Sequence, residues 1–374
     1  MLEYSPTALL IIAVVGATTL FTAAICGLLQ NDLKRIVAFS TISQLGYMVL
    51  IIGLSHYDFA LLHVIGHACF KALIFLASGS VIHSLVDSDQ DIRRMGGLIQ
   101  FLPLTFSVMM IGTLALIALP FMSGFYSKDI ILEIALGSYS WSGTYGYILG
   151  TITAGLTSFY SFRLIILVFF SKPNATVNSY NGAHEANTVV IISLAVLALF
   201  SIFFGYIASD MLTGTGNDIF GTSIFVLPNN VAVIEAEFAL PLILKLLPTI
   251  LSIIGAATAV YIYTYQFNLL VNLTNTKLGR SLYRFINGKA LIDIVINQYI
   301  ISSSLTKALN ISKVLDRGII ELIGAYGLST SLSQLSSIAS RSIAKLGTNI
   351  PQYSIFIAFS MFALNFILNT NIGL

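Results

Sequence analysis

The chain of 374 residues is 56% hydrophobic and only 9% charged, with a mean hydropathy of +0.90 and a formal net charge of +2. Soluble domains carry about 25% charged residues, so this composition predicts an all-α polytopic membrane protein. No basic run with interleaved aromatic residues indicates nucleic-acid binding, and no glycine-rich phosphate loop indicates nucleotide binding. Cys26 and Cys69 lie in apolar spans without paired spacing, which argues against disulfides, iron–sulfur ligation and zinc sites.

The first two predicted crossings run from Pro6 to Leu29 and from Ile36 to Leu54. A polar turn with Lys34 separates them. The third, Ala60 to Ile82, contains histidines and a lysine at i, i+4 and i+8, which lie on one stripe about 12 Å long. These residues are His63, His67 and Lys71.

A lysine near the middle of a crossing costs roughly 2.5–3.5 kcal/mol to insert, so Lys71 needs a partner, water or a function. Three interpretations of His63 and His67 stay open: hydrogen-bonded packing residues, ligands of a metal or haem, or members of a file of proton-exchanging groups. Imidazole titrates near neutrality, and an ammonium group taken out of water gives up its proton more easily. Only the proton file also accounts for Lys71.

The apolar stretch from Phe101 to Leu136 is too long for one regular helix and carries Pro120, Gly124 and then Lys128 in its middle. If it is one crossing made of two half-helices, all basic loop residues fall on one membrane face, as the positive-inside rule favours. These residues are Lys34, Arg35, Arg93, Arg94, Lys172, Lys277, Arg280 and Arg284. The sequence therefore predicts a discontinuous helix, which is typical of transporters. The alternative for Lys128 is a structural pair with Asp129 or Glu133 that seals the kink.

Three further crossings are predicted at Tyr145–Phe170, Thr188–Ala208 and Ala239–Phe267. We expect Arg163 to reach the interface and Lys245 to extend towards the acidic loop of residues 209–238. Segment 172–187, with His184 and Glu185, is predicted to be a solvated connector.

From 269 to 349 charges recur every few residues while apolar positions return at helical spacing. This pattern predicts a long amphipathic helix on the membrane face or across neighbouring proteins, followed by a terminal crossing at Tyr353–Ile372. The total is about eight crossings, including the discontinuous helix. A strap of this kind implies partner subunits.

Three motifs together resemble the second half of the antiporter-like subunit 5 family of NADH:ubiquinone oxidoreductase, respiratory complex I. The motifs are QNDLKRIVAFSTISQLGYM (30–48), HVIGHACFK (63–71) with ASGSVIH (77–83), and GFYSKD (124–129). The resemblance implies that His63, His67 and Lys71 form a central proton relay and that Lys128 lies near the exit, with Asp129 as its possible partner. Lys34 falls in a turn and is the weaker candidate.

The resemblance also implies a domain order: a second five-helix repeat (1–172), two further transmembrane helices (173–267), a lateral amphipathic helix region (268–350) and a C-terminal transmembrane anchor (351–374). The first repeat of the family is missing from this sequence. Either the subunit is encoded as two polypeptides or this sequence is a partial product; we expect a split subunit, with a separate chain that carries the first repeat. Further expected partners are the other complex I membrane-arm subunits and membrane lipid, and not nucleic acid.

The implied function is proton translocation as a subunit of the H⁺-translocating NADH:ubiquinone reductase, driven by electron transfer elsewhere in the complex. The chain itself is expected to hold no cofactor or metal; NADH, FMN, iron–sulfur clusters and ubiquinone would belong to partner subunits. Enrichment in Ile, Asn, Ser, Phe and Tyr suggests an organellar gene and the mitochondrial inner membrane. The alternatives are a subunit of a multi-subunit cation/proton antiporter, a plastid-type relative, or a structural clamp without transport.

Overall fold

The computed structural model describes residues 2–85, 89–214, 219–220, 223–346 and 350–370. Asp87 and Asp218, two acidic loop residues of the sequence, lie outside this part. The chain divides into two compact units, Met1–Leu291 and Ile292–Leu374.

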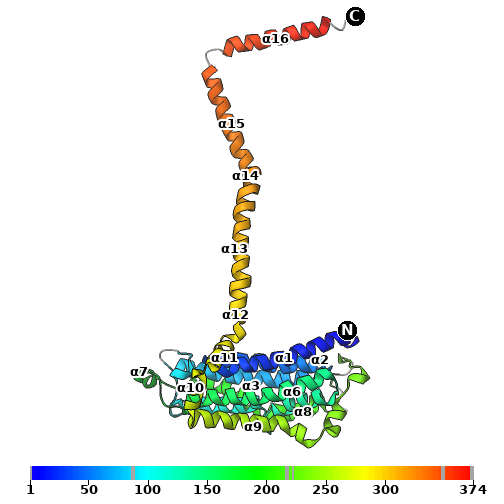
Figure 1. Ribbon diagram of the computed structural model, residues 1–374, viewed down its shortest axis with the longest axis vertical. Helices are drawn as coiled ribbons and strands as arrows, with labels where there is room; N and C mark the ends of the chain where they lie inside the picture. Colours follow the sequence, from blue (N-terminus) through cyan, green and yellow to red (C-terminus); the bar gives the residue numbers. More distant parts are fainter. Residues whose placement is uncertain (1, 86–88, 215–218, 221–222, 347–349, 371–374) are drawn as a thin grey trace. The chain divides into compact units, whose positions relative to one another are not determined.

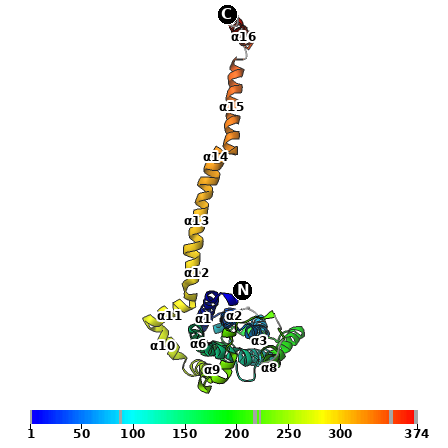
Figure 2. The same cartoon turned by 90° about the vertical axis from the view of Figure 1, so that its right-hand side faces the viewer.

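Within the described residues, six helices are long and apolar enough to cross a membrane. They are α1 (Pro6–Leu29), α2 (Leu33–Gly53), α3 (Tyr57–Ser84), α6 (Trp141–Ile165) with its π-helical extension η5 (Ile166–Phe170), α8 (Thr188–Thr213) and α9 (Leu242–Thr264). These helices lie side by side as one bundle (Figures 1 and 2). The predicted all-α polytopic architecture is confirmed.

The predicted interruption of the fourth crossing is also confirmed. Helix α4 (Pro103–Ile117) ends at Ala118, whose left-handed backbone (φ 65°) cannot continue it. After a turn the chain resumes as the π-helical η4 (Phe125–Asp129) and then α5 (Ile130–Gly137). Helix α8 holds the break, since the N–H of Ser123 donates to the carbonyl of Ser201 at 3.2 Å. At Gly205 of α8 an added Cβ would lie 2.5 Å from Ser123 Cα, so this close approach requires glycine.

The basic loops gather at one end of the bundle. The N–H of Leu33 donates to the carbonyl of Gln90 at 2.9 Å, which joins the α1–α2 turn to the loop after α3. The side-chain amide of Asn174 donates to the carbonyl of Arg93 at 3.2 Å and adds the loop after η5. This grouping is the one that the positive-inside argument requires.

The two halves of the broken helix connect opposite ends of the bundle. At the basic end Glu185 caps α4, because its Oε1 accepts the N–H of Leu104 at 2.8 Å. Glu185 is thus a helix cap, and its prediction as a solvated connector was wrong. At the other end Gly137 packs against Ala236, to whose Cα an added Cβ would come within 2.8 Å. The broken helix is therefore a single crossing.

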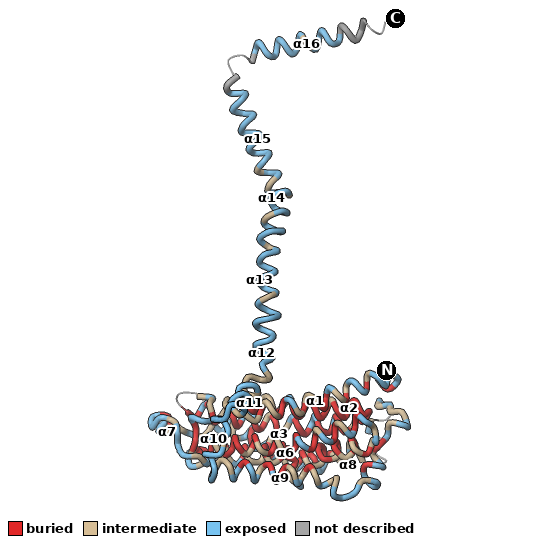
Figure 3. The backbone as a smooth tube through the Cα atoms, viewed as in Figure 1, coloured by how far each residue is buried: buried red, intermediate tan, exposed pale blue. Residues whose placement is uncertain are grey.

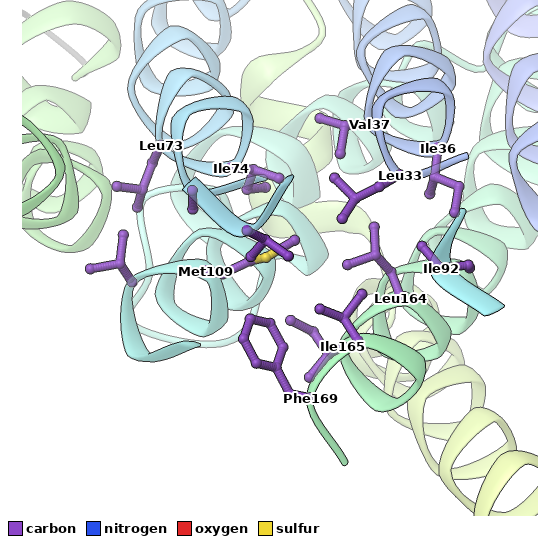
Figure 4. Packing of buried hydrophobic residues seen from close by; sticks show 14 of the residues in the cluster. Leu33, Ile36, Val37, Leu73, Ile74, Ile92, Met109, Leu164, Ile165 and Phe169 are labelled. Atoms are coloured by element: carbon purple, nitrogen blue, oxygen red, sulfur yellow. The ribbon is translucent and has the colours of Figure 1, made fainter. Parts of the chain in front are cut away.

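Small residues and apolar side chains close the bundle. Helices α1 and α2 approach so closely that a Cβ on Gly46 would lie 2.6 Å from the backbone nitrogen of Leu20. Residues of α2, α3, α4 and α6 meet in the larger apolar core, seen in Figure 4. Its labelled members are Leu33, Ile36, Val37, Leu73, Ile74, Ile92, Met109, Leu164, Ile165 and Phe169. Buried residues concentrate in these bundle helices (Figure 3).

Arg163 ties α6 to the end of α1. Its Nη1 donates to the carbonyls of Leu28 at 2.6 Å and Gln30 at 2.8 Å, and its Nη2 donates to Oδ1 of Asn31 at 2.9 Å. The guanidinium therefore satisfies carbonyls that the helix end leaves without partners and lies at the negative end of its dipole. Although Arg163 was expected to reach the interface, it is buried in this contact.

Two short helices follow α9, namely α10 (Phe267–Asn275) and α11 (Lys277–Asn287), and α7 (Val177–Asn181) lies in the loop before α8. Both α10 and α11 belong to the first unit. The predicted lateral region starts at 268, and its first part is joined to the bundle, because Asn287 and Tyr283 of α11 bond to Gln30 and Asn31.

The second unit is a run of helical segments, and the predicted long helix is present within it. The segments are α12 (Ile292–Ile294), η10 (Val295–Ile301), α13 (Ser302–Ile311), η11 (Ser312–Ile320), α14 (Glu321–Ile323), α15 (Ala325–Leu346) and α16 (Ile350–Thr370). Gly324 interrupts it with a non-helical backbone (φ −82°, ψ −146°). The apolar side chains of this unit are exposed, and Leu305 for example is 64% exposed. Most of the unit is accordingly coloured as exposed in Figure 3. Helix α16 lies in the predicted anchor, and residues 371–374 of that anchor lie outside the described part.

A polar cluster at the acidic end joins the N-terminus to the loop before α9. Glu3 accepts a hydrogen bond from Tyr57 Oη at 2.6 Å and another from Asn230 Nδ2 at 2.9 Å. His56 Nδ1 lies 2.7 Å from the carbonyl of Leu54, and its Nε2 accepts the N–H of Ala232 at 3.2 Å. Burial lowers the pKa of His56, and its neutral form fits this pair of contacts.

Replacing Arg163 by Met is expected to destabilise the bundle by about 3 kcal/mol, because three oxygens at the end of α1 lose a charged donor. The measurement is the thermal unfolding midpoint of the full chain in detergent. The control is Arg94→Gln, which removes an exposed arginine paired with Asp89 and is expected to change the midpoint little. Equal midpoints for R163M and wild type would contradict this role.

The lowered pKa of His56 predicts that the loop around Ala232 loosens in acid. The neutral imidazole stabilises the fold above its ordinary pKa of about 6.5, and that contribution is lost as the pH falls through the lowered value. Hydrogen exchange of the Ala232 amide, corrected for intrinsic rate, should therefore accelerate on acidification. In His56→Gln the acceleration should disappear; if it persists, another group controls the loop.

Candidate functional site

Polar side chains from four elements converge inside the bundle, from α2, α3, η4 and α6. The residues are Ser40, Gln44 and Tyr47; His63, His67 and Lys71; Ser127, Lys128 and Asp129; and Thr157. Each of them is at most 7% exposed. Isolated polar groups are costly in such an interior, so their mutual contacts decide what the site can do.

The two histidines of α3 form the centre of the cluster. His63 Nδ1 lies 2.8 Å from Ser127 Oγ, and its Nε2 lies 3.2 Å from Gln44 Oε1. The ring of His67 stacks one turn further on, with 6.0 Å between the two ring centroids. Both ring nitrogens of His63 are thus in hydrogen bonds, which argues against the metal or haem interpretation. Among the described residues no three His, Cys, Asp or Glu side chains are grouped to hold a metal ion.

Lys71 extends the histidine stripe by another turn of α3. Its Nζ donates a hydrogen bond to Ser40 Oγ of α2 and lies 5.8 Å from the ring centroid of Phe75. Ser40 Oγ in turn donates to the carbonyl of Val37 at 2.8 Å. A neutral hydroxyl therefore partners this lysine, and among the described residues no carboxylate forms an ion pair with it.

Lys128 lies in the π-helical turn of the broken helix. Its Nζ donates to Thr157 Oγ1 of α6 at 3.3 Å and lies 5.4 Å from the ring centroid of Tyr47. Among the described residues, no hydrogen bond or close ion pair joins Lys128 to Asp129 or Glu133, although the charge of Asp129 acts on Lys128 through space. Asp129 Oδ2 is buried without a hydrogen-bond partner among the described residues.

Glu133 interacts with Lys245 of α9 instead, at 3.9 Å between Oε2 and Nζ. Lys245 also donates to the carbonyl of Glu237, so it reaches towards the acidic loop as predicted. Glu133 lines a cleft of about 740 Å³ at the acidic end of the bundle, together with Asp210 and Glu237. Glu133 lies one helical turn beyond Asp129.

The structure brings four of the predicted site residues into one cluster, with Asp129 beside them. Those four are His63, His67, Lys71 and Lys128. Lys34 is not among them, since it is exposed in the first turn of α2, six residues before Ser40 or about 9 Å along the helix.

Four partners in the cluster were not singled out from the sequence. They are Ser40, Gln44, Ser127 and Thr157. Ser40 and Gln44 stand at i and i+4, so they share one face of an apolar helix, and this spacing could have marked them. Ser127 and Thr157 carry no such signal, because hydroxyl groups in apolar helices commonly bond only to their own backbone.

Ser127→Ala is expected to destabilise the chain by about 1–3 kcal/mol, because it leaves His63 Nδ1 buried without its partner. Ser123→Ala is the matched control in the same broken helix. Ser123 Oγ is buried without a partner among the described residues, so its removal should be neutral or stabilising. Thermal unfolding of both variants in detergent checks the difference, and equal shifts would contradict the contact.

Two family descriptions match consecutive parts of this chain. Residues 1–157 match the family described as NADH:quinone oxidoreductase/Mrp antiporter, TM, and residues 160–368 match the NADH dehydrogenase subunit 5 C-terminus. The first match covers the helices that carry the cluster up to Thr157.

Curated relatives named NADH-ubiquinone oxidoreductase chain 5 are similar over nearly the whole sequence. The protein of Schizophyllum commune is 56% identical over 98% of this chain and 53% of its own length. The protein of Cryptococcus neoformans is 52% identical over 98% of this chain and 55% of its own. That of Marchantia polymorpha is 44% identical over 91% and 51%. The chain spans about half the length of these relatives, and it belongs to the NADH dehydrogenase subunit 5 family.

Proposed function

We propose that this chain is part of a proton-translocating membrane subunit of NADH:ubiquinone oxidoreductase, in which the buried Lys/His cluster is the relay. The observation that carries the proposal is the row of ionisable groups along α3 and into η4. Both lysines donate hydrogen bonds to neutral hydroxyls, and in the described part of the chain neither forms an ion pair with a carboxylate. A lysine held by a hydroxyl can lose its proton without leaving a carboxylate uncompensated, whereas an ion pair would oppose that loss.

The relay would run from Lys71 through His67 and His63 to Lys128. The stacked imidazoles cover one turn of α3. His63 then bonds to the hydroxyl of Ser127, which directly precedes Lys128 in the chain. A hydroxyl both donates and accepts, so Ser127 can pass a proton while its own charge stays unchanged.

The far side of the relay would open at the acidic end of the bundle. Asp129 follows Lys128 directly and holds a buried oxygen that can take up a proton. Glu133 lies one turn further on and lines the 740 Å³ cleft. Carboxylates at a mouth of this kind attract protons and cations. The same end lacks the basic loops, which fits the positive side of the membrane.

No redox step is assigned to this chain; moving one charge against the membrane potential requires about 2.3 kcal/mol per 100 mV. That free energy would come from NADH-to-ubiquinone electron transfer, with FMN and iron–sulfur clusters in partner subunits. The proposal also includes the other membrane-arm subunits as partners and a separate chain that carries the first repeat. It places the complex in the mitochondrial inner membrane.

The test replaces each relay lysine by Met in the intact, membrane-bound complex. Lys71→Met or Lys128→Met should lower the number of protons pumped per NADH oxidised, because the relay is interrupted at one member. Lys172→Met, in an exposed loop of the same unit, is the control and should leave the ratio unchanged. The ratio is measured from proton uptake and NADH absorbance in sealed vesicles.

A structural clamp without transport predicts the opposite result. If both lysine variants assemble and pump with the wild-type ratio, the relay is wrong and the clamp is favoured. A cation/proton antiporter would instead show sodium- or potassium-dependent proton movement without NADH.

A further inference from the structure

The segment after α9 combines positive charge with an exposed apolar surface. Between Tyr265 and Ile292 the sequence holds four Lys or Arg residues and no Asp or Glu. Three of the four lie on α11, where they are exposed, and their side chains form no ion pair within the described part of the chain. These three, Lys277, Arg280 and Arg284, are called the α11 basic stripe below.

The spacing along α11 separates charged and apolar faces. The basic stripe stands at i, i+3 and i+7, so its side chains share one face. Leu278, Leu282 and Phe285 stand on another face at i, i+4 and i+7 and are 71%, 50% and 49% exposed. A short helix with this division lies in a membrane interface, with its apolar face among acyl chains and its charges among headgroups.

Hydrogen bonds fix the position of this helix on the bundle. Gln30 Nε2 donates to the carbonyl of Asn287 at 3.2 Å, and Asn31 Nδ2 donates to Tyr283 Oη at 3.3 Å. Thr276 caps the start of α11 by accepting the N–H of Gly279 at 3.0 Å. The basic stripe is thus held at the end of the bundle where α1 ends and where the other basic loops gather.

A cleft adjoins the stripe at Thr276. It measures about 540 Å³ and is lined by the amide side chains of Gln266, Asn268 and Asn272 and by the apolar Leu269 and Leu273. Amide donors beside an apolar wall suit the phosphate and glycerol of a lipid whose chains continue along the helix.

We propose that the α11 basic stripe and this cleft bind the headgroup of an anionic phospholipid from the leaflet at the basic end of the bundle. Charge complementarity favours this occupant, because the three cations of the stripe have no ion partner among the described residues and clustered Lys and Arg side chains are attracted to an anionic leaflet. The exposed apolar face favours lipid over an acidic protein, since a protein partner recognised by charge would not require three open hydrophobic side chains beside the stripe. The inference does not depend on the proposed proton relay.

The experiment uses the full chain purified in detergent and titrated with dioleoyl-phosphatidylglycerol or with dioleoyl-phosphatidylcholine, with retained lipids counted by native mass spectrometry. Wild type should retain phosphatidylglycerol in preference to phosphatidylcholine. The triple variant K277Q/R280Q/R284Q should bind phosphatidylglycerol at least about tenfold more weakly and lose the preference. Raising the salt to about 0.5 M should weaken the wild-type preference in the same way.

A matched control removes the same number of charges from the second unit. Lys307, Lys313 and Arg317 are exposed there, and K307Q/K313Q/R317Q should keep the preference. The variant R280K/R284K retains the charge and should keep it too, which guards against a loss caused by misfolding. Equal retention of both lipids by wild type would overturn the proposal and leave an acidic protein surface as the partner of the stripe. The proposal would also fail if K307Q/K313Q/R317Q lost the preference for phosphatidylglycerol as fully as the stripe variant does.

Discussion

The main constraint on the bundle is that it buries two lysine side chains, whose ammonium groups need polar partners there. Lys71 and Lys128 are almost fully buried, and each donates to a hydroxyl of a neighbouring helix, Ser40 and Thr157. A hydroxyl is a neutral partner, so it places no negative charge beside the ammonium group. These two hydrogen bonds require α2 and α6 to pack against the elements that carry the lysines, because each ammonium group must lie within hydrogen-bond distance of its hydroxyl.

The break in the fourth crossing follows from the same requirement. A regular helix would leave its backbone fully paired, whereas the turn before Phe125 frees groups that other helices must satisfy. Helix α8 does so through the carbonyl of Ser201, and Gly205 allows its close approach. His63 of α3 bonds to Ser127 just beyond the turn. The interruption thus lets α3 and α6 contact adjacent residues of one segment.

The two ends of the bundle carry different chemistry. At one end hydrogen bonds join the basic loops, Arg163 caps α1, and α11 presents its basic stripe. At the other end Glu3 and His56 tie the N-terminus to the loop before α9, and Glu133 lines an acidic cleft. Basic loops at one end orient a multi-pass chain across a membrane, so the buried cluster has two chemically distinct sides.

The sequence by itself determined the membrane class, the apolar crossings, the interruption near Pro120 and the stripe of His63, His67 and Lys71, because hydropathy, helix breakers and helical spacing are local properties. It could not determine which groups would partner them. Ser127 and Thr157 look like ordinary helix residues, and Glu185 looks like a loop residue, until folding brings other helices beside them. Lys245 could equally be assigned to several carboxylates. Only the tertiary structure decided these contacts, because hydrogen bonds between segments distant in sequence depend on how the helices pack.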